Sequence, residues 1–180
     1  MDNQLEHLIQ QTQVTLYLFQ DDGAIPNNPT LPFLVYPGAL QITGDDPAVV
    51  AEHVFTANGW GGLWRNGIYS FHHYHSTAHE VLAICRGEAR VQFGGEQGVV
   101  LEVRPRDVVV IPAGVGHKNL GSSDDLLVVG AYPPGQQWDL CSGRPEERPG
   151  VLENIARVPL PLTDPVFGQE GPLLEHWGVQ

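Results

Sequence analysis

Histidines gather in one short stretch of this sequence. The stretch GIYSFHHYHSTAHEVLAICRG, residues 67–87, holds four of the chain's eight histidines within eight positions, and a glutamate directly follows the last of them. Imidazole and carboxylate groups are common ligands of divalent transition metals, and they also form hydrogen-bonded polar clusters without a metal. Which of these side chains share a face decides between the two interpretations.

The alternation of side chains along a strand separates these histidines into two groups. Alternate residues of a strand lie on one face, so His73 and His75 point the same way, together with Tyr69 and Phe71. His72 lies on the opposite face, and we expect it to be a surface group or a neighbour of the ligands rather than a ligand itself. The same expectation holds for the histidine at position 79.

The next apolar run, EVLAICR, supplies the carboxylate. Glu80 begins this run and shares a face with Leu82 and Ile84, which predicts that the face looks into the interior. Two imidazoles and one carboxylate would then converge in an apolar space, where unpaired polar groups are costly, and one divalent cation would satisfy them all. The expected fourth ligand is His117, which follows Pro112 and a turn that contains glycine.

The elements that position these residues are short and extended. Apolar runs recur from residue 67 to about residue 133, and Gly, Pro or Asp stands at each join. Strands spaced about ten residues apart predict an antiparallel sandwich or barrel. The predicted strands are IYSFHHYH, EVLAICR, ARVQFG, GVVLEV, DVVVIPA and LLVVGAYP.

Segments on both sides of this region are predicted to belong to the same domain. Within residues 1–66, QVTLYLF and LPFLVYPGAL are expected to be extended, and AVVAEHVFTA a short helix. Asp46 is its expected cap and Pro47 its first helical residue. Residues 134–180 are expected to form an arm with one short helix near EERPGVLENIAR, which leaves residues 67–133 as the barrel core.

Composition excludes several classes of partner. The 180 residues carry a formal net charge of −12, and Lys118 is the only lysine, so neither nucleic acid nor an anionic membrane is expected as the main partner. No run approaches the roughly 20 apolar residues of a membrane span, and no secretory signal is visible. The expected location is the cytoplasm. The two cysteines do not suggest a disulfide framework.

The histidine stretch resembles the cupin superfamily. The first cupin motif is a glycine, five residues, His-x-His, three or four residues, a glutamate, six residues and a glycine. The fixed positions are filled here by Gly67, His73, His75, Glu80 and Gly87. The resemblance implies an all-β fold, a double-stranded β-helix or jelly-roll barrel, with one or two short flanking helices. It also implies a bound metal ion.

The second cupin motif matches with two departures. Pro112, Gly114 and His117 fit it, whereas Arg106 stands where a glycine is expected and Gly121 where an asparagine is expected. After Pro105, we expect a type I turn, which accepts a residue other than glycine. The whole chain resembles small bacterial single-cupin (monocupin) proteins of unassigned activity, in FQDDGAIPN, WRNG, HHYHS, VGAYP, ARVPLP and DPVFG.

Several chemistries fit such a site. Three imidazoles and one carboxylate suit a divalent ion of Fe, Mn, Ni, Cu or Zn, and ligand type alone does not choose among these metals. A redox metal would support a dioxygenase acting on a small organic molecule, and a Lewis-acid metal an isomerase or lyase, with Glu80 as a candidate base. A binding or sensing protein without turnover is a third alternative.

Residues near the ligands are candidates for a substrate pocket. Arg65 either pairs with a substrate carboxylate or forms an ion pair with one of the chain's many acids. The other candidates are large and mostly apolar, as pocket walls and cores both are: Tyr69, Phe71, Leu82, Ile84 and Tyr132. Apolar runs at both chain ends favour a homodimer, in which the N-terminal strand or the C-terminal arm crosses to the partner.

Overall fold

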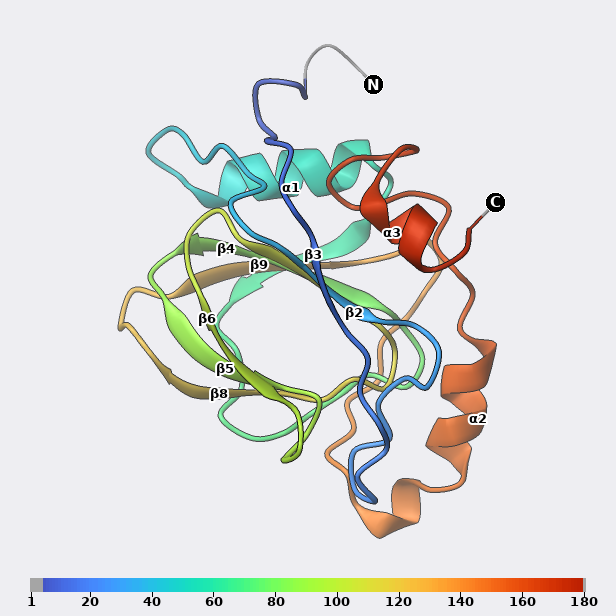
Figure 1. The fold of residues 1–180 in the computed structure, drawn as a ribbon. Coiled ribbons are helices and arrows are strands. Elements are labelled where there is room, and N and C mark those ends of the chain that lie inside the picture. The colour runs from blue at the N-terminus through green and yellow to red at the C-terminus, as the bar shows by residue number, and fades with distance from the viewer. Residues whose placement is uncertain (1–4, 180) are drawn as a thin grey trace.

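Two antiparallel β-sheets lie face to face in the computed structural model, which describes residues 5–179 (Figure 1). The larger sheet has the order β1-β2-β7-β4-β9-β3, and the smaller has the order β6-β5-β8. The strand bounds are β1 Thr15–Tyr17, β2 Phe33–Tyr36, β3 Gly61–Asn66, β4 Glu80–Arg86, β5 Ala89–Phe93, β6 Val99–Val103, β7 Val108–Ile111, β8 His117–Ser122 and β9 Leu127–Tyr132. This arrangement confirms the predicted jelly-roll double-stranded β-helix.

Alternating side chains divide the larger sheet into an inner and an outer face. Leu82 and Ile84 of β4 pack between the two sheets with Phe33 and Phe93, whose ring centroids are 4.4 Å apart. The intervening Val81 and Ala83 belong to a second core on the outer face. The predicted inward face of β4, which begins with Glu80, is therefore confirmed.

Helices cover the outer face of the larger sheet. Helix α1 (Ala48–Ala57) lies across β3, β4 and β9, and α3 (Pro172–His176) packs beside it, whereas α2 (Gly150–Arg157) lies apart from both and packs through Val151 on Ile25 and Tyr74 (Figure 1). A short 3-10 helix, Pro145–Glu147, precedes α2. The sequence predicted α1 and α2 but not α3. No helix among residues 5–179 has the length and apolarity needed to cross a membrane.

Three details of the predicted elements were wrong. The segment IYSFHHYH is extended but forms only isolated bridges, because its hydrogen bonds go alternately to β8 and to Cys141. Strands β3 and β8 were not predicted, although β3 pairs with β9 and β8 with β5. Helix α1 begins at Ala48 rather than Pro47, but the carboxylate of Asp46 still accepts a hydrogen bond from the Ala48 N–H, at 3.2 Å.

The turn between β6 and β7 corrects the expectation for Arg106. Its φ is +85°, and the Asp107 N–H donates to the Arg104 carbonyl at 3.1 Å, so the turn is type II and not type I. The third residue of such a turn requires a positive φ, which is why glycine is usual there. Arg106 is held by hydrogen bonds from its guanidinium to the Leu40 carbonyl and to the side chains of Gln10 and Gln41.

Candidate metal centre

The segment before β4 places two histidines on one side of the chain. His73 exchanges backbone hydrogen bonds with His117, at 3.2 and 2.9 Å, and Tyr74 exchanges two with Cys141, both at 3.0 Å. The backbone is therefore extended, and alternate side chains point in opposite directions. His73 and His75 face one cavity, whereas Tyr74 is fully buried in a separate cluster on the other side.

The third histidine is positioned by a tight turn. Residues 112–116 connect β7 to β8, and His117 is the first residue of β8. Gly114 has a φ of +93°, and a Cβ built there would lie 2.4 Å from the Asn27 carbonyl oxygen. Only glycine fits without movement of the backbone. The buried His79 imidazole accepts a hydrogen bond from the Ala113 N–H, which holds the same turn against β4.

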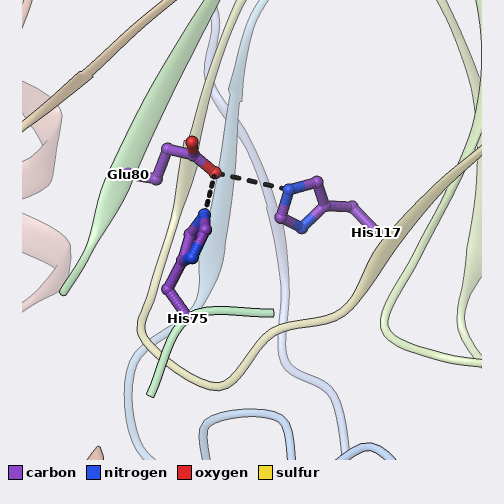
Figure 2. Close-up of side chains that lie close together, drawn as sticks. All are labelled: His75, Glu80 and His117. Carbon is purple, nitrogen blue, oxygen red and sulfur yellow. Dashed lines mark ion pairs between the residues drawn. The ribbon is translucent and has the colours of Figure 1, made fainter. Parts of the chain in front are cut away.

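Three side chains converge at the buried end of the cavity. The Glu80 Oε2 atom lies 3.4 Å from His75 Nε2 and 3.3 Å from His117 Nε2 (Figure 2). All three residues are buried, and their ligand atoms lie within 4.8 Å of one another. Two ligands bound at about 2.1 Å to one ion lie about 3.0–3.4 Å apart for octahedral or tetrahedral angles. The observed separations fit a shared ion.

Hydrogen bonds fix the tautomer of each histidine. The Nδ1 atoms of His73 and His117 lie 3.1 and 3.3 Å from the carbonyl oxygens of Phe71 and Val115, and that of His75 contacts the Asp139 carbonyl. A carbonyl only accepts, so each Nδ1 carries the proton and each Nε2 is left with its lone pair. Metal-binding histidines are oriented by this kind of bond.

His73 lies beside the cluster of three rather than within it. Its ring centroid is 3.9 Å from that of His117 and 6.2 Å from that of His75, and its side chain lines the same cavity. Burial lowers the pKa of His73 to about 3, and the charge of His117 acts in the same direction. The imidazole is therefore neutral, as a metal ligand must be.

Glu80 and His75 form a coupled pair. Burial alone would raise the pKa of Glu80, but the charge of His75 and the close contacts with both His75 and His117 hold it well below its usual range. Burial acts to lower the pKa of His75, but Glu80 outweighs it and raises that pKa. Glu80 is thus a carboxylate, and its Oε2 atom has no hydrogen-bond partner.

The second oxygen of Glu80 is bound by a tyrosine. The Tyr132 hydroxyl donates to Glu80 Oε1 at 3.1 Å and accepts a hydrogen bond from Trp64 Nε1 at 2.9 Å. The Tyr132 ring stacks on Trp138, with centroids 4.3 Å apart and an angle of 8° between the planes. Sequence reasoning proposed Tyr132 only as a pocket wall and missed both tryptophans, which lie on either side of the predicted barrel core, residues 67–133.

A cavity of about 340 Å³ opens above the cluster. Of the predicted pocket residues, Arg65, Tyr69, Leu82 and Tyr132 line it. Phe71 does not; it stacks on Tyr69 at the rim, with ring centroids 5.0 Å apart. Ile84 does not either, because it lies two residues further along β4, in the core between the sheets.

Two predicted groups have partners away from the ligands. The Arg65 guanidinium binds both carboxylate oxygens of Glu52, at 2.6 and 2.7 Å, and Asp46 at 2.8 Å, which agrees with the ion-pair alternative for this residue. The His72 Nε2 atom lies 2.9 Å from Glu96, outside the cavity. His72 therefore lies where the alternation predicted.

Comparisons with known proteins agree with this architecture. The family model described as Cupin domain matches residues 64–129. Uncharacterized protein YjlB of Bacillus subtilis (strain 168) is 47% identical over 167 residues, which cover 93% of this chain and 98% of that protein.

Solved structures similar to the chain are more distant. Procruciferin, an 11S globulin from Brassica napus, is 14% identical with a TM-score of 0.36, and the match covers 75% of this chain but only 27% of the globulin. Acireductone dioxygenase from Bacillus anthracis, with a cadmium ion in its active centre, is 17% identical with a TM-score of 0.36, covering 66% of this chain and 76% of that one. With a relative so similar over nearly its whole length, and a family model that spans the candidate ligands, the chain belongs to the cupin family.

Proposed function

We propose that the chain binds one divalent metal ion through the Nε2 atoms of His73, His75 and His117 and the Oε2 atom of Glu80. The observation that carries this proposal is the buried Glu80 Oε2 atom, which has no hydrogen-bond partner and lies between two imidazole nitrogens that have lone pairs. Desolvating an unpaired carboxylate oxygen is costly, and a cation removes that cost. Fe, Mn, Ni, Cu and Zn all accept this ligand set.

We further propose that the site acts on a small organic molecule as a mononuclear-metal dioxygenase. When bound, a redox-active divalent ion supplies open coordination positions and the electron transfer that chemistry with O2 requires. The surrounding residues bind the substrate and exclude water. The cavity of about 340 Å³ lies in the usual range for small-molecule pockets, roughly 300–1,000 Å³.

The lowered pKa of Glu80 favours this reaction over isomerase or lyase chemistry. Those reactions need a general base whose pKa lies near the working pH. The pKa of Glu80 is held well below its usual range, and its Oε1 atom already accepts the Tyr132 hydrogen bond. Among the described residues that line the cavity, Glu80 is the only carboxylate, and the three histidines are assigned to the metal.

Metal content per chain tests the ligand set. Protein without a histidine tag is expected to hold about one ion per chain, and His75→Ala is expected to lose it. His72→Ala is the matched control and should keep the ion, because His72 contacts Glu96 outside the cavity. His73→Ala distinguishes four protein ligands from three. Loss of the ion in this variant would mean that His73 is a necessary fourth ligand. Retention of the ion by all three variants would contradict the proposed centre.

Oxygen uptake tests the reaction. The metal-loaded protein is expected to consume O2 with small diketones, enols or catechols, and His75→Ala should not. Binding of such molecules without O2 uptake would contradict the dioxygenase and favour a binding or sensing protein, whereas isomerised or cleaved product without O2 uptake would favour the isomerase or lyase.

The expected homodimer is proposed to form along β1. This strand is at the edge of the larger sheet, and Leu16 and the adjacent Leu18 are 41% and 52% exposed. The C-terminal arm is a weaker alternative, because its Leu173 and Trp177 pack into the core of their own chain. Sedimentation at micromolar concentration should give twice the 19.7 kDa chain mass, and Leu16→Lys should lower it. A monomeric wild type would contradict the dimer.

The cytoplasmic location also stays a prediction.

A further inference from the structure

The cavity above the candidate metal centre lacks a free positive charge. Arg65 is the only lysine or arginine among its described lining residues, and Glu52 and Asp46 occupy its guanidinium through three nitrogen–oxygen contacts of 2.6 to 2.8 Å. These contacts hold the guanidinium against Glu52 of α1 and Asp46 of the segment before it. A guanidinium that already binds two carboxylates has little attraction left for a third.

The hydrogen-bond donors that lie against Glu80 and the imidazoles already have partners. The Trp64 indole donates to Tyr132, and the Tyr132 hydroxyl donates to Glu80. The Nδ1–H groups of the three histidines point to backbone carbonyls. An anionic group away from the metal would therefore lose its hydration without gaining a charge partner, which is unfavourable.

The net charge of the proposed metal centre also restricts how much negative charge a ligand can carry. A divalent ion bound with the Glu80 carboxylate has a net charge of about +1, which balances one ionised oxygen at the metal but no second anionic group. The chain as a whole has a formal net charge of −12, which repels anions at longer range. A carboxylate or phosphate group in addition to the one that binds the metal is thus disfavoured.

The walls of the cavity are flat and apolar. Tyr132 and Trp138 form a nearly parallel stacked pair in the wall, and the lining ring of Tyr69 is backed at the rim by Phe71, with an angle of 21° between their planes. At the rim, Tyr69, Trp138 and Leu140 are 50%, 49% and 53% exposed although each lines the cavity. Large apolar groups exposed around a pocket mouth are typical of ligand-binding sites.

From these features we infer that the site selects a flat, mostly apolar molecule that chelates the metal through two neighbouring oxygens and carries no further anionic group. Enediols, hydroxyketones and catechol-like rings belong to this class. The inference rests on the proposed metal centre and makes it more specific. Arg65, which resembles an anion-binding residue in the sequence, is held by Asp46 and Glu52 in a position that excludes acidic substrates.

The experiment compares a neutral probe with an anionic probe of the same ring. 4-Methylcatechol and 3,4-dihydroxybenzoate have the same ring and the same chelating oxygens, and the second bears a carboxylate in place of the methyl group. Binding to Zn(II)-loaded protein is measured by calorimetry, because zinc does not turn the probes over. We expect 4-methylcatechol to bind at least tenfold more tightly, and Trp138→Ala to weaken its binding about tenfold by removing the stacking wall.

A double variant tests the role of the Arg65 ion pairs. Asp46→Asn/Glu52→Gln frees the Arg65 guanidinium, and the tenfold preference for the neutral probe is expected to fall to about twofold. Equal or tighter binding of 3,4-dihydroxybenzoate by the wild type would overturn the inference, and so would failure of both probes to bind zinc-loaded protein. Zinc content, measured first on the same samples, separates these results from failure of the metal centre itself.

Discussion

At the scale of single residues, Glu80 divides its two oxygens between different partners. Oε1 accepts the Tyr132 hydroxyl, and Oε2 faces the imidazoles without a hydrogen bond. A carboxylate with one oxygen occupied in this way is prepared to bind an ion through the other oxygen alone. Trp64 extends the arrangement, since its indole N–H holds the Tyr132 oxygen at 2.9 Å.

Removal of the Tyr132 hydroxyl should weaken metal binding. Tyr132→Phe keeps the ring that stacks on Trp138 but frees Glu80 Oε1, and hydrogen bonds of this kind are worth about 10- to 100-fold in metal affinity. Competition with a chelating dye measures that affinity. Trp64→Phe should lower the metal affinity less, because Trp64 is one hydrogen bond further from Glu80. Unchanged affinity in Tyr132→Phe would show that Glu80 needs no such support.

The candidate ligands could be predicted from the sequence because alternation depends only on an extended backbone. His73 and His75 share a face even though their segment is not a regular strand. Their supporting contacts could not be predicted in this way. Asp139, whose carbonyl orients His75 and whose carboxylate binds the Ser76 N–H at 2.6 Å, lies more than 60 residues away in a segment without periodic pattern. Such contacts follow from tertiary packing.

At the scale of elements, the β6–β7 turn combines an unfavourable backbone with favourable side-chain contacts. Arg106 has a φ of +85°, which costs about 1–2 kcal/mol for a residue with a Cβ. Its guanidinium donates to the Leu40 carbonyl at 2.9 Å, which ties the turn to the segment after β2. The glycine that the cupin motif has at this position was the one sign of this φ, because Pro-Arg by itself favours a type I turn.

Two substitutions at Arg106 separate backbone from side chain. Arg106→Ala removes the hydrogen bonds and keeps the backbone strain, whereas Arg106→Gly removes both. We expect the alanine variant to have a free energy of unfolding about 1 kcal/mol lower than the glycine variant, because glycine adopts a positive φ at no steric cost. Urea denaturation measures the difference. Equal stability of the two variants would argue against strain in this turn.

The 3-10 helix before α2 should make stability depend on pH. The Glu147 carboxylate accepts hydrogen bonds from the Tyr74 hydroxyl at 2.7 Å and from the Ser142 and Gly143 N–H groups at 2.9 and 3.0 Å. Burial acts to raise the pKa of Glu147, but these bonds outweigh it and lower the pKa below the usual 4.5.

A lowered folded pKa means that the unfolded chain takes up a proton first as the pH falls. The stabilisation by Glu147 is therefore present above about pH 4.5 and is lost as the pH falls through the lower pKa of the folded chain. Urea denaturation between pH 6 and pH 3 should show a shallower loss of stability in Glu147→Gln than in the wild type. Parallel curves would contradict this contribution.

The fold itself was predictable wherever strands are buried on both faces. β7 is apolar throughout and β4 is apolar between Glu80 and Arg86, and both were recognised. β8 was missed because most of its residues are exposed or half-buried and its sequence, HKNLGS, has no apolar alternation. β3 contains two glycines and has a register shift between Gly61 and Trp64. Strands of this kind form because neighbouring strands offer hydrogen bonds, which local sequence does not reveal.

At the scale of the whole molecule, segments from both ends of the chain contribute to the core on the outer face of the larger sheet. Leu34 and Tyr36 of β2, near the N-terminus, share the outer core with Leu173 and Trp177 near the C-terminus. The buried Asp164 joins these regions, since its Oδ2 atom accepts hydrogen bonds from the Tyr36 hydroxyl at 2.7 Å and the Leu173 N–H at 3.0 Å. The inner face, which carries the candidate metal ligands, is thus supported from behind.

Because folding assembles these ligands from three separate segments, a bound ion should stabilise the entire fold. Metal at 100 times its dissociation constant adds about 2.7 kcal/mol to the free energy of unfolding. For a chain of 180 residues, that corresponds to a Tm increase of about 5–10 °C. Thermal unfolding at pH 8 with metal and with a chelator should show this difference in the wild type and in His72→Ala, but not in His75→Ala.

The metal-dependent increase in Tm should disappear in acid. The pKa of His75 is raised by Glu80 when no ion is bound, so the protonated pair stabilises the folded chain below about pH 6.5 and loses this contribution as the pH rises through the higher folded pKa. The ion requires neutral His75 and therefore has the opposite dependence. The Tm difference between metal-loaded and chelated protein should be full at pH 8 and nearly absent at pH 5. An equal difference at both pH values would mean that the ion does not displace a proton from His75.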